Sequence, residues 1–186
     1  HDVESVSSHS YSVAVISLTM SETLRLHKQA VNVEKVLRMA LLHDLSESLT
    51  FDISKAYLKY LGRKGSQLKT RLERRAASHI LAGLQSEPLS QIFRNDLEEY
   101  AASRSLEAKI VHCADAIDLL LQVIEYEKMG YSKSALDQIW KETKSTLMSQ
   151  RLPLANRWLR RFEHVRESLA GNNSRTRSRY RRVKRS

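Results

Sequence analysis

Apolar residues recur at intervals of three and four positions through almost the whole 186-residue chain, a spacing typical of amphipathic α-helices. The chain holds only 5 glycines and 2 prolines, so it has few of the residues that build the turns of β-sandwiches and β-barrels. We therefore expect an all-α fold, a single-domain bundle of about seven helices. The predicted helices cover roughly residues 8–28, 33–48, 66–84, 88–100, 105–129, 133–149 and 153–169.

Residues that favour helix ends stand at several of these boundaries. Asn32 precedes the second helix and is expected to cap its N-terminus. Pro88 and Pro153 suit the first turns of their helices, and Gly130 suits the position just after a C-terminus. These residues support a chain of helices joined by short connections.

The net charge of +10 is concentrated at the C-terminus. Seven of the 31 basic residues follow Gly171 and no acid does, so 24 bases face 21 acids in residues 1–170. We expect a domain at residues 1–170 and a basic, Arg-rich tail at residues 171–186. Such a tail is most often a solvated segment, and contact with nucleic acid is the alternative. The seven are Arg175, Arg177, Arg179, Arg181, Arg182, Lys184 and Arg185.

Cysteine count and hydropathy exclude several classes of protein. The single cysteine excludes an intrachain disulfide framework and a zinc site built from several cysteines, and it suits a reducing compartment. No apolar run approaches the roughly 18 residues of a membrane span, and we find no signal peptide. We therefore expect a cytoplasmic protein without a membrane partner.

The polar pair His43-Asp44 interrupts an otherwise apolar helical stretch, residues 39–45. Adjacent helical residues diverge by about 100°, yet two such side chains can converge on one ion beside the helix. Glu47 follows one turn later on the same face. The alternative is a helix end at which both side chains form hydrogen bonds with solvent.

Asp115 lies in residues 110–117, the segment with the strongest buried-helix character. An ionised carboxylate in such a place costs several kcal/mol unless a cation or another charged partner is close. A salt bridge to an arginine is the alternative to a metal ion. His9 follows a run of serines near the start of the first helix, and alone it indicates an ordinary exposed histidine.

Taken in order, His9, His43-Asp44 and Asp115 resemble the ligand pattern of the HD-domain metal-dependent phosphohydrolases, and more narrowly that of the YfbR-like 5′-deoxynucleotidases. The resemblance covers about residues 2–130 and includes Asp52-Ile53. It implies one divalent metal ion per chain, held by those four residues. It also implies a catalytic role for Glu47, which would orient or deprotonate a water molecule, and a substrate-binding role for Asp52.

Two positions differ from the family pattern. The family has an arginine upstream of the first histidine that holds the substrate phosphate; the sequence begins at His1, so we expect this arginine to precede the printed residues. Phe51 replaces the glycine that usually precedes the aspartate matched by Asp52.

The ligand set of two imidazoles and two carboxylates suits Mn²⁺, Co²⁺, Ni²⁺, Zn²⁺ or Mg²⁺. The expected reaction is hydrolysis of (deoxy)nucleoside 5′-monophosphates to nucleoside and phosphate. One alternative is an HD hydrolase of another phosphate ester, such as a nucleoside triphosphate or an alarmone. A second alternative is a non-catalytic, nucleic-acid-associated protein that uses the tail. Family members are commonly dimers, which implies a homodimer here.

Other conspicuous residues are expected to be structural. Cys113 neighbours apolar residues and suits a small core side chain. Trp140 and Trp158 stand at helical spacing, which favours packing in the core or in a dimer interface over base stacking. His112 lies near the face of Asp115, but the family pattern has no ligand at that position.

Overall fold

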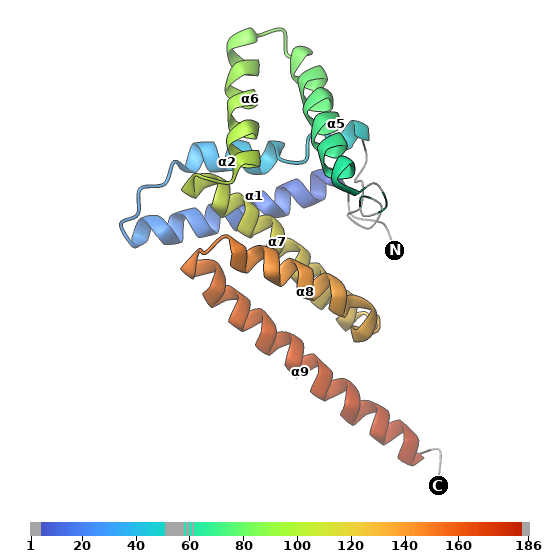
Figure 1. The fold of residues 1–186 in the computed structure, drawn as a ribbon. Helices are drawn as coiled ribbons and strands as arrows, with labels where there is room; N and C mark the ends of the chain where they lie inside the picture. Colours follow the sequence, from blue (N-terminus) through green and yellow to red (C-terminus); the bar gives the residue numbers. More distant parts are fainter. Residues whose placement is uncertain (1–4, 51–57, 59, 61, 184–186) are drawn as a thin grey trace. The chain divides into compact units, whose positions relative to one another are not determined.

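The computed structural model describes residues 5–50, 58, 60 and 62–183, and of residues 63, 66 and 170–183 it describes the backbone alone. Throughout these ranges the regular elements are helices, and seven of them have ten residues or more, as predicted (Figure 1). The chain forms two compact units, His1–Val111 and His112–Ser186, and each is described by itself. The helices are α1 (Val6–Leu26), α2 (Val33–Leu42), α3 (Glu47–Thr50), α5 (Gly62–Ala82), α6 (Glu87–Ala102), α7 (Leu106–Lys128), α8 (Lys133–Ser149) and α9 (Pro153–Val183).

The predicted helix caps are present. The Asn32 side chain accepts a hydrogen bond from the backbone N–H of Lys35 at 3.1 Å, which satisfies a donor that the first turn of α2 leaves without a helical acceptor. Pro88 lies in the first turn of α6, and Pro153 begins α9. Gly130 adopts a φ of +98° just beyond the end of α7, a conformation that glycine adopts without the steric cost of a Cβ atom.

The second helix ends earlier than its apolar spacing predicts. It ends at Leu42, and a turn over residues 43–46 separates it from α3, so the expected continuation to residue 48 is wrong. In this turn the backbone N–H of Leu45 bonds to the carbonyl of Leu42 at 3.0 Å, and that of Glu47 bonds to Asp44 at 2.9 Å. These bonds span three residues rather than four, so the chain is wound more tightly here than in an α-helix.

The last helix is longer than expected. The prediction ended it near residue 169, but α9 continues to Val183 and includes the backbone of most of the basic segment. Arginine is a good helix former, and no proline follows Pro153 to interrupt the helix. The division into a domain at residues 1–170 and a tail at residues 171–186 stays a prediction. None of the helices described here is both long and apolar enough to cross a membrane.

The first unit is built by a series of helix contacts. Helix α1 packs on α2, α2 on α6, α6 on α5, and α5 on α3. Helices α5 and α6 follow one another as a helical hairpin (Figure 1). Val13 and Met20 of α1 and Val36 and Met39 of α2 are fully buried, because each helix turns one apolar face inward. The α1–α2 contact brings the start of α1 near the end of α2.

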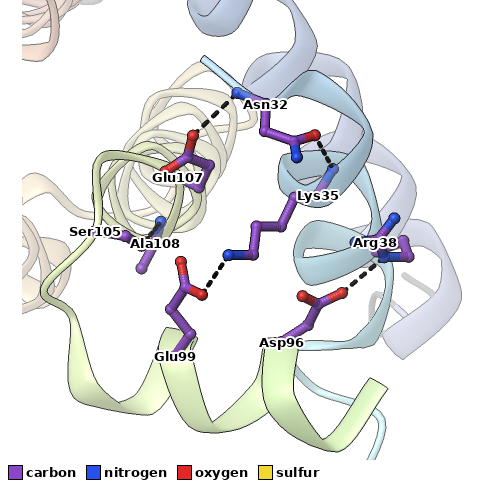
Figure 2. Close-up of polar contacts among 8 residues, drawn as sticks. All are labelled: Asn32, Lys35, Arg38, Asp96, Glu99, Ser105, Glu107 and Ala108. Atoms are coloured by element: carbon purple, nitrogen blue, oxygen red, sulfur yellow. Dashed lines mark hydrogen bonds and ion pairs between the residues drawn. The ribbon is translucent and has the colours of Figure 1, made fainter. Parts of the chain in front are cut away.

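Ion pairs fasten α2 to α6 (Figure 2). The Lys35 ammonium donates to the Glu99 carboxylate, and Arg38 Nε donates to Asp96 Oδ2 at 2.7 Å. The Asp96 side chain is only 4% exposed, so its charge depends on Arg38 for compensation. These pairs hold in place the helix that leads into His43. Figure 2 draws the whole cluster: Asn32, Lys35, Arg38, Asp96, Glu99, Ser105, Glu107 and Ala108.

The second unit contains a buried ion cluster centred on α9. Arg166 donates from Nε and Nη2 to one Glu127 oxygen at 2.9 and 2.6 Å, and from Nη2 to Asp137 at 2.8 Å. Its guanidinium carbon lies 4.5 Å from the centroid of the Trp140 ring, in cation–π contact. The cluster links α7, α8 and α9, and Trp140 is buried in the core as expected.

Cys113 of α7 is fully buried. Burial raises the pKa of its thiol to about 12, so the thiolate is scarcely populated at neutral pH. The prediction that Cys113 is a core side chain is confirmed.

Candidate metal centre

The predicted residues His9, His43 and Asp44 come from two helix ends that the α1–α2 contact brings together. His9 lies in the first turns of α1, His43 caps the C-terminus of α2, and Asp44 follows in the turn. The His43 side chain is 1% exposed, whereas those of His9 and Asp44 are 18% and 26% exposed. The cluster is therefore partly open to solvent through His9 and Asp44, whereas His43 is buried.

Their donor atoms converge. Asp44 Oδ2 lies 3.5 Å from His9 Nε2 and 3.3 Å from His43 Nε2. One ligand atom from each residue lies within 4.8 Å of the others, and the two imidazole centroids are 5.3 Å apart. Imidazole nitrogen and carboxylate oxygen are the donors that first-row divalent ions bind. The three residues fit a metal site by the chemistry of their donors and by their spacing.

The backbone orients the His43 ring. His43 Nδ1 lies 2.9 Å from the carbonyl oxygen of Ala40. A carbonyl oxygen can only accept, so Nδ1 carries a hydrogen, and Nε2 is the ring nitrogen that faces Asp44. A hydrogen bond from the other ring nitrogen to a backbone carbonyl is the usual way in which proteins orient a histidine for a metal.

Asp44 is held in its ionised form. Burial alone would raise the pKa of its carboxyl group, but the hydrogen bond with His43 and the positive charges of His43, His9 and Lys69 outweigh this effect. The pKa of Asp44 is therefore below its ordinary value, and the carboxylate offers a negatively charged oxygen at neutral pH.

A cavity of about 320 Å³ opens beside His43 and Asp44. Glu47, the first residue of α3, lines it, and the ring of Tyr100 stands edge-on to His43 with centroids 5.7 Å apart. The remaining lining residues come from the turn at Ser46 and from the α5–α6 hairpin: Lys69, Thr70, Glu73, Arg74, Ala77, Leu97, Glu98 and Ala101.

Two further predicted site residues are Asp115 and Asp52. Asp115 is half-buried on α7 in the second unit, and its role as a fourth ligand stays a prediction. Asp52, with its neighbour Phe51, lies outside the described residues. Lys69 and Arg74 were not predicted as site residues. Residues 69, 70, 73, 74 and 77 share one face of a helix, but a polar face of this kind is equally typical of a helix that meets solvent.

Comparison with known sequences shows a match to the HD domain family over residues 1–154. A 5′-deoxynucleotidase HDDC2 from Danio rerio is 32% identical over 140 residues, which cover 75% of this chain and 64% of the relative. The HDDC2 from Homo sapiens is 29% identical over 140 residues, 75% of this chain and 63% of the relative. The chain thus spans less than two thirds of the length of these relatives.

Solved structures share the fold. The PH0347 protein from Pyrococcus horikoshii OT3 superposes with a TM-score of 0.69 at 27% identity, covering 90% of this chain and 85% of that protein. An HD-domain phosphohydrolase from Listeria innocua superposes with a TM-score of 0.65 at 22% identity, covering 81% of this chain and 71% of that protein.

Proposed function

Because the chain belongs to the HD-domain family, whose pattern matches residues 1–154, we propose that it is a divalent-metal-dependent phosphomonoesterase acting on (deoxy)nucleoside 5′-monophosphates. The observation that carries the proposal is the convergence of His9, His43 and Asp44 beside a cavity of about 320 Å³. That volume is at the lower end of the range for small-molecule sites and suits a mononucleotide. The relatives named 5′-deoxynucleotidase support the substrate class.

His9, His43 and Asp44 would hold one divalent ion per chain, with Asp115 as the further ligand that the sequence pattern supplies. Two carboxylates offset the charge of a Mn²⁺, Co²⁺, Ni²⁺, Zn²⁺ or Mg²⁺ ion. When bound, such an ion offsets the charge of the phosphoryl group and lowers the pKa of a water ligand.

The residues of the chain supply the rest of the chemistry. Glu47 lies on the cavity wall next to His43 and Asp44, where its carboxylate accepts a proton from the attacking water. The water oxygen forms a bond to phosphorus as the bond from phosphorus to the 5′-oxygen breaks. The 5′-oxygen takes a proton from Glu47 as the nucleoside leaves, which returns Glu47 to its carboxylate form. Asp52 is assigned to the sugar by the resemblance to the family.

The test is a phosphate-release panel with nucleoside mono-, di- and triphosphates and an alarmone, in Mn²⁺, Co²⁺ and Mg²⁺ and in EDTA. We expect release from the monophosphates in the presence of metal and none in EDTA. Release from triphosphates or the alarmone alone would favour a different HD hydrolase. Absence of any release, together with nucleic-acid binding that is lost on deletion of residues 172–186, would favour a non-catalytic protein.

The role of Asp115 has its own test. The variant Asp115→Ala should lose metal while it keeps its helical circular-dichroism signal. Stoichiometric metal in this variant, measured by elemental analysis, would remove Asp115 from the proposed site.

We further propose that the protein is a cytoplasmic homodimer. Ile139 and Met148 of α8 and Val165 of α9 are apolar residues at least 40% exposed, and burying them against a second copy would remove this apolar surface from water. Light scattering after gel filtration measures the mass, and a monomer at micromolar concentration would contradict the dimer.

A further inference from the structure

One face of α5 forms a wall of the cavity beside the candidate metal centre. Lys69, Thr70 and Glu73 line the cavity together with Arg74 and Ala77, at spacings that place all five on one side of the helix. The proposed hydrolysis assigns no role to this wall.

The other charged residues of the cavity leave it rich in negative charge. Asp44, Glu47, Glu73 and Glu98 all line it, whereas Lys69 and Arg74 are its basic lining residues. A phosphate dianion that enters such a cavity is repelled by each carboxylate. Positive groups on the wall are therefore needed close to the place where the phosphate sits.

Lys69 is the better placed of the two cations. Its side chain is 23% exposed, and its ammonium pairs with Glu73 one turn later at 3.5 Å. Its charge also interacts with the Asp44 carboxylate of the candidate metal centre. Arg74, by contrast, is exposed, and solvent screens its charge more strongly.

We propose that Lys69 is a substrate-binding residue that binds the phosphate oxygens of the nucleotide; this inference rests on the proposed function. The ion pair with Glu73 holds the ammonium at the cavity wall before substrate binds. A lysine suits this role, because its flexible stem lets a compact charge move from the carboxylate to a more highly charged phosphate.

The test compares Lys69→Met with Lys64→Met, an identical change at an exposed position of α5 outside the cavity. Two quantities are measured with Mn²⁺ present: kcat and KM for thymidine 5′-monophosphate, and the affinity for inorganic phosphate by titration calorimetry. In Lys69→Met we expect KM to rise and phosphate affinity to fall by about 10- to 100-fold, the usual range for a charged hydrogen bond. Metal stoichiometry should stay unchanged, Lys69→Arg should recover most of the affinity, and Lys64→Met should match the unmodified protein.

Phosphate affinity and KM within about twofold of the unmodified protein in Lys69→Met would overturn the proposal. So would an equal loss in Lys64→Met, since that would show a general effect of helix charge. A second variant, Lys69→Gln, repeats the measurement should the methionine variant fail to fold. If the unmodified protein hydrolyses no nucleotide, the proposed function fails; Lys69 is then judged by phosphate affinity alone, and equal affinity in both proteins counts against it.

Discussion

The two units of the chain each contain a cluster of charged and polar side chains, and the two clusters compensate their carboxylates in different ways. In the second unit, Glu127 and Asp137 both accept hydrogen bonds from Arg166. Burial alone would lower the pKa of the Arg166 guanidinium, but these two hydrogen bonds outweigh burial and raise it. The cation is part of the protein, so this cluster is complete in itself.

The cluster in the first unit has a carboxylate and two imidazoles. Asp44 Oδ2 lies 3.5 Å from His9 Nε2 and 3.3 Å from His43 Nε2. Protons on the imidazoles compensate the carboxylate and lower its pKa, and a bound metal ion would take their place. The Arg166 cluster contains its own cation and braces helices. The cluster of His9, His43 and Asp44 consists of nitrogen and oxygen donors, which is the composition of a metal site.

The largest effect is expected from removing charge at the candidate metal centre. Asp44→Asn keeps the shape of the side chain but removes its negative charge, so metal should be lost and phosphate release should fall by roughly 10³-fold. Elemental analysis and a phosphate assay measure these losses, and circular dichroism should show unchanged helix content. Glu22→Gln, at an exposed acid of α1, serves as the control. Stoichiometric metal in Asp44→Asn would show that the cluster in the first unit does not need the Asp44 charge to bind metal.

The next effect concerns stability in the second unit. Arg166→Met leaves Glu127, whose side chain is 5% exposed, without the partner that compensates its charge, so the free energy of unfolding should drop by about 3–5 kcal/mol. Urea denaturation measures this change. Arg160→Met, an exposed change on the same helix, should cost no more than about 0.5 kcal/mol. If the Arg166 and Arg160 variants were equally stable, the Arg166 cluster would not brace the helices.

A smaller loss is expected at the pair that fastens α2 to α6. Arg38→Met removes the partner of the buried Asp96 and should cost about 2–3 kcal/mol. Metal affinity should weaken with it, because α2 leads directly into His43. Arg25→Met is the matched control, since the pair of Arg25 with Glu22 is about half-exposed and is worth at most about 1 kcal/mol. Unchanged metal affinity in Arg38→Met would show that the ion pair between α2 and α6 does not position His43 for metal binding.

The smallest effect is a pH dependence. The hydrogen bonds from Lys35 and Ser105 lower the pKa of Glu99 from its ordinary value of 4.5, and they outweigh burial, which raises it. An acid with a lowered pKa in the folded protein stabilises the fold above its unfolded pKa, and this contribution is lost as the pH falls through the folded pKa. Below about pH 4.5, Glu99→Gln should therefore show a shallower loss of stability than the unmodified protein, by less than about 1 kcal/mol. Denaturation at pH 3–7 tests this, with Glu125→Gln as the exposed control.

The sequence predicted the helices well because their signals are local. Apolar spacing and the caps at Asn32, Pro88 and Gly130 depend on residues within one or two turns of each other, and these predictions are confirmed. The break at residues 43–46 was missed, because leucines continue the apolar spacing across it while backbone bonds of a tighter turn form instead. The extension of α9 was missed because the apolar spacing stops near residue 169, whereas the arginines that follow continue the helix.

For the candidate site, the adjacency of His43 and Asp44 could be predicted, since neighbouring residues cannot lie far apart. His9 and the family pattern supplied a further expectation, and the structure brings His9 to the other two. The roles of Asp115, Glu47 and Asp52 stay proposals. The wall that contains Lys69 had no signal of its own, because a basic face of a helix looks the same in sequence whether it meets solvent or a cavity.

The sequence by itself determined the helical class of the chain, most helix boundaries and the adjacent pair at the centre of the candidate site. These depend on propensity and on interactions within about four residues, which any local stretch of chain carries with it. Only the tertiary structure decided that His9 meets Asp44, that Arg166 compensates Glu127, and that α5 faces the cavity. Those contacts join residues 35 or more positions apart, or depend on which face of a helix is covered, and they arise only when the helices pack against one another.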